Sequence, residues 1–159
     1  MKPILFLLFF LPVCIPVEAE VTLPGIFTGN MVIQRDRPVQ IWGWADPGEK
    51  IQVSFNGQNV SAKAIEDGSW IIQLKSMPAS DIAQNLMVVS KQNDIILQNV
   101  LIGDVWICSG QSNMVWPMRN LSIGEEECEQ ANYRFLRMFT VSNEMALIPQ
   151  DDLGGTGWK

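Results

Sequence analysis

Short runs of alternating apolar and polar residues, separated by turn residues, are the feature that most constrains the fold of this chain. Ile51, Val53 and Phe55 alternate with polar side chains, and Asn56-Gly57 follows directly. This period places apolar side chains on one face of a strand, and Asn-Gly is a strong signal for a two-residue hairpin. The pattern therefore predicts two antiparallel strands joined by a tight turn.

The same pattern of short strand-like runs separated by turn residues extends across residues 20–102. Turns are expected at Asp46-Pro47-Gly48 and Asp67-Gly68, where the residue types suit a reversal of the chain. The other strand-like runs are residues 31–34, 39–45, 60–64, 70–74, 86–90 and 95–101. Several short strands with no helix between them predict a mainly β domain, in the form of an antiparallel β-sandwich.

Composition and charge exclude some classes of function. The chain has 159 residues, of which 47% are hydrophobic and 18% charged, as in globular proteins rather than disordered ones. Its formal net charge is −6, and it contains no basic run. Phosphate backbones and anionic lipid attract basic surfaces. Binding to nucleic acid is therefore not expected.

Residues 1–19 are predicted to be a secretory signal peptide. Lys2 gives a positive start, residues 4–13 are nearly all apolar, and Val17-Glu18-Ala19 provides a small residue at the cleavage point. The apolar run is shorter than the roughly 20 residues that a membrane span needs. We therefore expect no membrane span and an extracytoplasmic location, which is extracellular, lysosomal or periplasmic according to the host.

A secreted location bears on the cysteines and on glycosylation. Removal of residues 1–19 leaves Cys108 and Cys128, and an oxidising compartment permits a disulfide between them. Cys108 lies in an apolar run, so a buried free thiol is the favoured interpretation. Asn59 and Asn120 each begin an Asn-x-Ser sequon, which predicts glycosylation where the host modifies secreted proteins.

Three tryptophans of the predicted β domain have two interpretations. Trp42 and Trp44 would project from the same face of one strand, as a platform for stacking sugars requires. Aromatic residues at strand spacing are more often part of a core. Core packing is the favoured interpretation for Trp42, Trp44 and Trp70, and carbohydrate binding is the alternative.

The pattern changes after residue 102. Val105–Cys108 predicts a buried strand, a polar turn carrying Ser112 follows, and residues 124–131 have helix-forming composition. Residues 133–141 predict a second strand, and a polar tail follows. The order strand, helix, strand is the opening of a parallel α/β sheet. Four acidic residues between positions 125 and 129 are interpreted as a solvated helix face rather than as a metal site.

The turn at Ser112 has the composition of a nucleophile turn. A turn between a strand and a helix exposes a serine hydroxyl and aims backbone N–H groups at a developing oxyanion. Gly110 would relieve crowding where a substrate carbonyl approaches, and the N–H of Ser112 would be one oxyanion donor. The alternative from spacing alone is that Ser112 caps a helix.

A family resemblance sharpens this interpretation. Residues 103–114 read Gly-Asp-Val-Trp-Ile-Cys-Ser-Gly-Gln-Ser-Asn-Met. This run closely resembles the nucleophile block of the sialate O-acetylesterase family, a branch of the SGNH hydrolases. Residues 30–34 and 41–48 resemble the β domain that precedes the hydrolase there. The resemblance implies a β domain at residues 20–102, and the incomplete start of a flavodoxin-like SGNH-hydrolase domain at residues 103–159.

The resemblance also implies roles for single residues. Ser112 would be the catalytic nucleophile, with Gly110, Gln111 and Asn113 as its neighbours in the turn and at the oxyanion hole. The substrate would be an O-acetylated sialic acid or a related acetylated carbohydrate, with no metal and no organic cofactor. The oligomeric state is left open by the sequence.

One departure from the family pattern matters for activity. The SGNH mechanism needs a histidine base, and this chain contains no histidine. We therefore expect the chain alone to be inactive on acetyl esters. The alternatives to an esterase are a glycan-binding β-sandwich module that does not hydrolyse its ligand, and a non-functional gene fragment.

Overall fold

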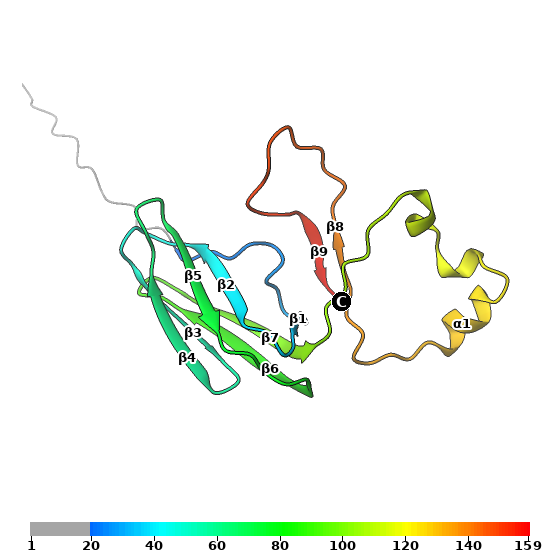
Figure 1. Cartoon of the computed structure of the whole chain (residues 1–159), viewed down its shortest axis with the longest axis horizontal. Coiled ribbons are helices and arrows are strands. Elements are labelled where there is room, and N and C mark those ends of the chain that lie inside the picture. Colours follow the sequence, from blue (N-terminus) through cyan, green and yellow to red (C-terminus); the bar gives the residue numbers. More distant parts are fainter. Residues whose placement is uncertain (1–19) are drawn as a thin grey trace, which may run out of the picture.

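The computed structural model describes residues 20–159, so the predicted signal peptide lies outside the described residues. Figure 1 shows the strands of residues 32–103 gathered into one body, from which the residues after 104 extend as long loops with short elements. No helix in the described part of the chain is long and apolar enough to cross a bilayer.

Seven strands form two sheets in the β body. The larger sheet has the strand order β1-β7-β6-β3-β4, and β2 and β5 form a separate antiparallel pair. The bounds are β1 (Val32–Gln34), β2 (Val39–Trp44), β3 (Lys50–Phe55), β4 (Gln58–Lys63), β5 (Ser69–Leu74), β6 (Ser80–Val89) and β7 (Asp94–Gly103). The prediction of a mainly β region is confirmed.

The hairpin between β3 and β4 has the predicted turn. Phe55 pairs with Gln58 across it, which leaves only Asn56 and Gly57 in the loop. Their φ angles are 47° and 72°, the left-handed conformation that both central residues of a type I′ turn adopt. Asparagine and glycine tolerate this conformation better than other residues. The register of the hairpin therefore follows from two residues.

One pairing differs from an all-antiparallel arrangement. β1 runs parallel to β7, with Val32 opposite Leu101 and Gln34 opposite Gly103. The chain leaves β1 for β2 in the other sheet, so no tight turn joins the two partners. A parallel pair needs such a long connection, whereas antiparallel strands can be joined by a hairpin.

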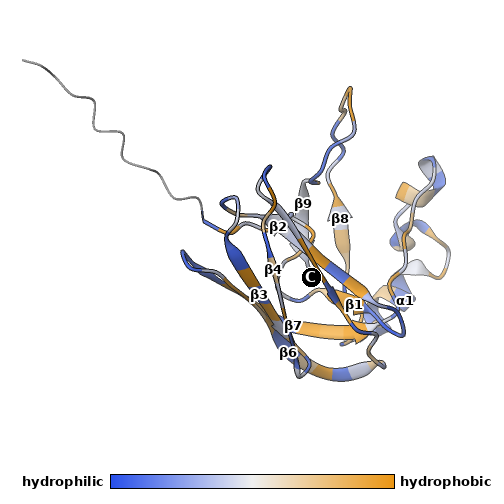
Figure 2. Cartoon of the chain, turned by 60° about the vertical axis from the view of Figure 1, so that its left-hand side comes forward, coloured by the Kyte–Doolittle hydropathy of each residue, from blue (hydrophilic) through white to orange (hydrophobic). Residues whose placement is uncertain are grey.

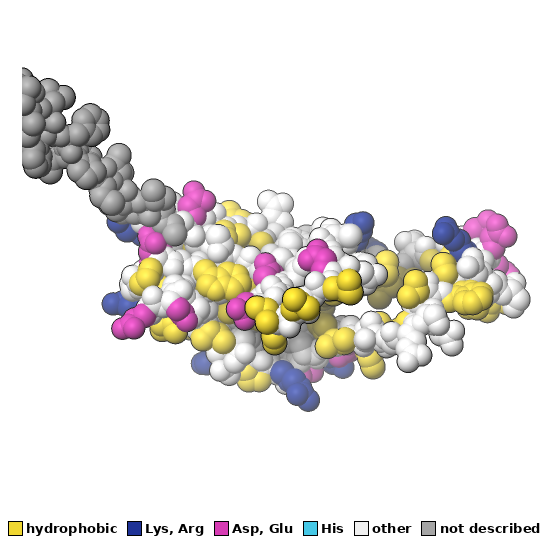
Figure 3. Space-filling model, turned by 90° about the horizontal axis from the view of Figure 1, so that it is seen from above, with side chains coloured by type: hydrophobic (Ala, Val, Ile, Leu, Met, Phe, Trp, Pro, Cys, Tyr) yellow, Lys and Arg dark blue, Asp and Glu magenta, His cyan; other side chains and the backbone are white. Residues whose placement is uncertain are grey.

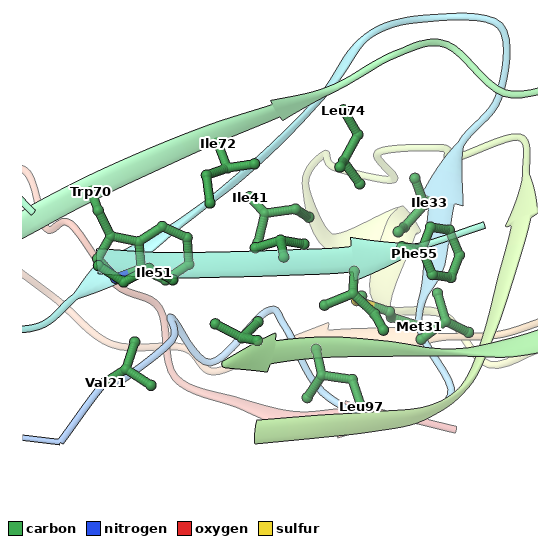
Figure 4. Packing of buried hydrophobic residues seen from close by; sticks show 14 of the residues in the cluster. Val21, Met31, Ile33, Ile41, Ile51, Phe55, Trp70, Ile72, Leu74 and Leu97 are labelled. Carbon is green, nitrogen blue, oxygen red and sulfur yellow. The ribbon is translucent and has the colours of Figure 1, made fainter. Parts of the chain in front are cut away.

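The core lies between the inner faces of the two sheets. Along β3 every second side chain is buried, which is the period predicted from the sequence. Figure 4 shows Ile41 and Ile72 of the smaller sheet packed toward Ile51 of the larger one. Figure 2 shows the end of β7 as a continuous hydrophobic run, and residues 100–102 are all buried. Full burial of one such aliphatic side chain stabilises the fold by roughly 1.5–3 kcal/mol.

Gly43 allows the amino-terminal segment to reach the smaller sheet. The backbone of Thr22 exchanges two hydrogen bonds with that of Trp44, at 2.8 and 3.0 Å. A Cβ atom on Gly43 would overlap the carbonyl oxygen of Thr22 and would lie 3.0 Å from the ring of Trp70. Only glycine leaves room for this close backbone approach.

We therefore predict that Gly43→Ala destabilises the β body. The free energy of unfolding should fall by about 2 kcal/mol, because backbone atoms must move to admit the methyl group. Urea unfolding followed by tryptophan fluorescence measures it. Gln40→Ala, an exposed change on the same strand, is the matched control and should stay within about 0.5 kcal/mol of the parent. Equal stability of the two variants would contradict the prediction.

Candidate functional site

The segment that carries Ser112, residues 104–159, is called the serine segment, and it begins at an ion pair on the β body. Arg35 Nε donates to Asp104 Oδ1 at 2.9 Å, and the backbone N–H of Val105 donates to Gln34 Oε1 at the same distance. The hydrogen bond and the charge of Asp104 raise the pKa of the Arg35 guanidinium above its ordinary value. Both groups are exposed, so the pair positions the chain more than it stabilises the fold.

The predicted strand before the serine is not formed. Residues 105–108 have no strand partner among residues 20–159, and Trp106 and Ile107 are 84% and 93% exposed. A strand of a parallel sheet is buried on both faces by neighbouring elements, and no described element covers this run. The prediction that Cys108 is buried is wrong for the same reason. Cys108 and Cys128 are both free and exposed, so the disulfide alternative is not formed.

Ser112 is the first residue of a short 3-10 helix, η1 (Ser112–Val115). Gln111 precedes it in an extended conformation, and its carbonyl accepts a hydrogen bond from the N–H of Met114 at 2.8 Å. Gln111, not Ser112, is the residue at the cap position, and no side chain there makes a capping bond. The helix-cap alternative for Ser112 therefore finds no support in this geometry.

The four predicted turn residues lie together in one exposed turn. Gly110, Gln111, Ser112 and Asn113 are consecutive and exposed. Within residues 20–159, neither the hydroxyl of Ser112 nor the backbone N–H groups of Ser112 and Asn113 take part in a hydrogen bond. The first N–H groups of a helical turn have no partner within it. The turn thus offers a free hydroxyl beside two free donors.

Gly110 lies close to a side chain of the same turn. A Cβ atom at this position would lie 2.5 Å from Cγ of Met114, which folds back over the turn. The neighbour that crowds this position is Met114, and the role of Gly110 beside a substrate carbonyl stays a prediction. Any larger residue would push that side chain outward.

The chain folds only locally after this turn. The elements are η2 (Met118–Asn120) and α1 (Gly124–Gln130), which pack against each other. A Cβ atom on Gly124 would overlap the carbonyl oxygen of Met118, so glycine starts the helix at this contact. Three glutamates occupy the first turn of α1, where the helix dipole favours negative charge, and they face solvent as expected.

The second predicted strand is reduced to its last three residues. β8 (Phe139–Val141) pairs with β9 (Gly155–Trp158), and the pairing is antiparallel. The predicted parallel β-α-β order is therefore not formed in the described part of the chain. An antiparallel partner that follows along the chain satisfies the edge of β8 without a crossover.

Trp158 ties the end of the serine segment to the β body. Its indole Nε1 donates to the carbonyl of Ile26 at 2.8 Å, and its backbone N–H donates to Thr28 Oγ1 at 3.3 Å. Its ring also packs against Phe139, at 5.7 Å between centroids. Nearby, the N–H of Gly25 donates to Asp152 Oδ1 at 2.7 Å. The hairpin of β8 and β9 is therefore docked, although residues 142–159 were predicted to be a polar tail.

The three tryptophans of the β body divide between the two interpretations. Trp70 is 3% exposed and belongs to the core, as favoured. Trp42 and Trp44 lie on the outer face of β2, and Trp42 is 36% exposed, so core packing is wrong for Trp42. Figure 3 shows other exposed hydrophobic side chains, both on the β body and on the extended region.

The two predicted glycosylation sites are accessible. Asn59 is exposed on β4, an edge strand of the larger sheet, and Asn120 is exposed at the end of η2. Modification at either site stays a prediction.

Comparison with known proteins finds relatives that share one name. No family model matches the chain. Over 135 residues the chain is 30% identical to the sialate O-acetylesterase of Mus musculus, and the matched region makes up 77% of this chain and 25% of the relative. The Homo sapiens sialate O-acetylesterase is 33% identical over 138 residues, covering 78% and 26%. The chain thus spans about a quarter of the length of these curated relatives.

A solved structure is also similar. The crystal structure of a carbohydrate acetylesterase from Xanthomonas citri superposes with a TM-score of 0.83 at 37% sequence identity. The match covers 88% of this chain and 32% of that protein.

We predict that Trp158→Phe loosens the serine segment without unfolding the β body. The change keeps an aromatic ring but removes the donor to Ile26, and loss of a part-buried hydrogen bond costs about 1 kcal/mol. Hydrogen exchange should become faster in β8 and β9 and stay unchanged in β3. Trp116→Phe, at an exposed indole, is the control. Unchanged exchange in β8 and β9 would contradict the anchoring role.

Proposed function

The chain belongs to the sialate O-acetylesterase family, and we propose that it carries the serine nucleophile of an esterase that removes acetyl groups from O-acetylated carbohydrates. The observation that carries the proposal is the exposed turn at Ser112, with its free hydroxyl and two free backbone donors. The names of the relatives supply the class of substrate, since one is a sialate O-acetylesterase and another a carbohydrate acetylesterase.

The proposed reaction is acyl transfer through a serine ester. A base removes the proton of Ser112 Oγ, which attacks the acetyl carbonyl and forms a tetrahedral oxyanion. The N–H groups of Ser112 and Asn113 are the donors that this chain offers to the oxyanion. Collapse of the intermediate breaks the bond to the sugar oxygen, which leaves as a hydroxyl. Water then cleaves the acetyl-serine, and acetate is released.

The base of the proposed reaction comes from outside these 159 residues. The sequence contains no histidine, and no titratable side chain within residues 20–159 makes a hydrogen bond to Ser112. A serine hydroxyl without a positioned base is a weak nucleophile. Gly110 and Gln111 shape the turn in this proposal, and neither takes part in proton transfer.

The chain also offers an apolar surface for the rest of a hydrolase fold. Trp106, Ile107 and Val115 are largely exposed and flank the serine turn. Each of the three is at least 81% exposed, whereas large aliphatic and aromatic side chains are usually buried. In the proposal these side chains pack against the remaining elements of the hydrolase, which would also complete the predicted strand at residues 105–108. Export of the protein through residues 1–19 belongs to the same proposal.

We expect Ser112→Ala, in an esterase that joins this chain to a complete hydrolase domain, to lower kcat by at least about a thousandfold, because the covalent intermediate can no longer form. Release of acetate from O-acetylated sialic acid and from acetylated xylo-oligosaccharides measures it and separates the two substrate classes. Ser109→Ala, three residues earlier in the same exposed segment, should keep most of the activity. Full activity of Ser112→Ala would refute the assignment of the nucleophile.

We expect the 159-residue chain by itself to release no acetate in a Ser112-dependent way. The chain is expected to be inactive because it has no base for Ser112, although the proposed nucleophile and the proposed oxyanion donors are present. The assay uses the same substrates with the purified chain and its Ser112→Ala variant. A rate that exceeds the spontaneous rate and disappears in the variant would show that the chain contains a base of its own.

A further inference from the structure

The outer face of β2 and β5 carries an aromatic platform. Trp42 and Trp44 point outward from β2, because the residues that alternate with them, Ile41 and Gly43, face the core. Across the sheet, Trp42 stands opposite Ile71, which is 55% exposed, and Trp44 stands opposite Ser69. Two indoles two residues apart thus share one exposed surface.

This platform forms the floor of a pocket. The cavity has a volume of about 690 Å³, which lies in the range of small-ligand sites. Its walls come from three directions: Lys63 from the end of β4, Asp67 from the turn before β5, and Asp151 from the connection between β8 and β9. Residues distant in the sequence therefore converge on the two indoles.

The platform is held in place before any ligand binds. Phe27 packs edge-on against Trp42, with ring centroids 4.6 Å apart and an angle of 76° between the rings. Phe27 itself packs against the hydrophobic core. Each residue of β2 from 39 to 44 pairs with β5. Because the backbone and one indole are already fixed, little conformational entropy would be lost on binding.

The lining combines the two kinds of contact that a sugar ring needs. One face of a pyranose ring presents C–H groups, which can cover an indole, and its edge presents hydroxyls. Carboxylates accept hydrogen bonds from hydroxyls, and an ammonium group donates to them. The side chain of Ser69, and then its backbone N–H, which donates to Asp67 Oδ1 at 2.8 Å, lower the pKa of Asp67 below its ordinary value.

The charges in the lining select among sugars. Asp67 and Asp151 bring two negative charges against one positive charge from Lys63. An acidic sugar would meet net repulsion in this pocket, whereas a neutral sugar would not. The face of β2 is also open on the outside, so a chain of several sugar units could extend beyond the pocket.

We propose that the outer face of β2 and β5, with Trp42 and Trp44 as its floor, binds a neutral oligosaccharide. This site is separate from Ser112 and does not depend on the proposed esterase activity. Its chemistry is stacking of sugar rings on indoles and hydrogen bonding of hydroxyls to Asp67, Asp151 and Lys63, with no covalent step.

The test uses the whole 159-residue chain. Neutral gluco-, xylo- and galacto-oligosaccharides are titrated against it, with sialyllactose as the acidic probe. Binding is followed by saturation-transfer NMR and by tryptophan fluorescence. We expect saturable binding of at least one neutral probe and no binding of sialyllactose. Trp44→Ala should weaken the binding by about tenfold or more.

Two further variants control for folding and for nonspecific stacking. Asp151→Asn keeps the size of an exposed side chain that makes no hydrogen bond within residues 20–159, and it should weaken binding with an unchanged circular dichroism spectrum. Trp106→Ala removes an exposed indole outside the pocket, and it should bind like the parent.

Several results would overturn the proposal. They are the absence of binding by every neutral probe, equal loss in Trp106→Ala and Trp44→Ala, and binding of sialyllactose alone. A dimer in sedimentation that Trp44→Ala dissociates would also overturn it, because the platform would then be covered by a second copy of the chain.

Discussion

The structure depends on the burial of aliphatic side chains between two sheets of unequal size. Ile41 and Ile72 come from the two-stranded sheet, and Ile51, Leu86 and Val100 from the five-stranded one, and all of them are almost fully buried. Two strands alone are marginally stable in water, so β2 and β5 persist because their inner face is covered. Their outer face is only partly covered, by Phe27 against Trp42, and it therefore leaves the two indoles accessible to solvent.

The sequence predicts those parts of the molecule whose conformation is decided locally. Alternation in β3 and the Asn56-Gly57 turn specify a hairpin with its register, since each depends on residues within a few positions. The turn at Ser112 is local in the same sense. The five residues from Gly110 to Met114 contain the close contact between these two and the start of the 3-10 helix η1, and Ser112 is exposed among them.

The parts that sequence reasoning missed are those decided by distant residues. The apolar run at 105–108 has the composition of a buried strand, but a strand also needs partners, and none of the described elements pairs with it. Burial of Cys108 fails with it. Trp158 was overlooked because its partner, Ile26, is 132 positions away. Trp158 is the one aromatic residue in residues 142–159, and this was the available signal, but it does not say where the ring docks.

The hairpin of β8 and β9 connects the two proposed sites. Trp158 in β9 fixes the end of the serine segment to residues 26–28, and Asp152 holds the connection between the strands against Gly25. The residue next to Asp152, Asp151, forms a wall of the tryptophan pocket. A saccharide bound on Trp42 and Trp44 would therefore touch the hairpin that docks the end of the serine segment on the β body. Since an interaction that orders this hairpin also restricts the residues tied to it, the platform and the end of the serine segment share one structural support, although the chemistries of the two proposed sites are independent.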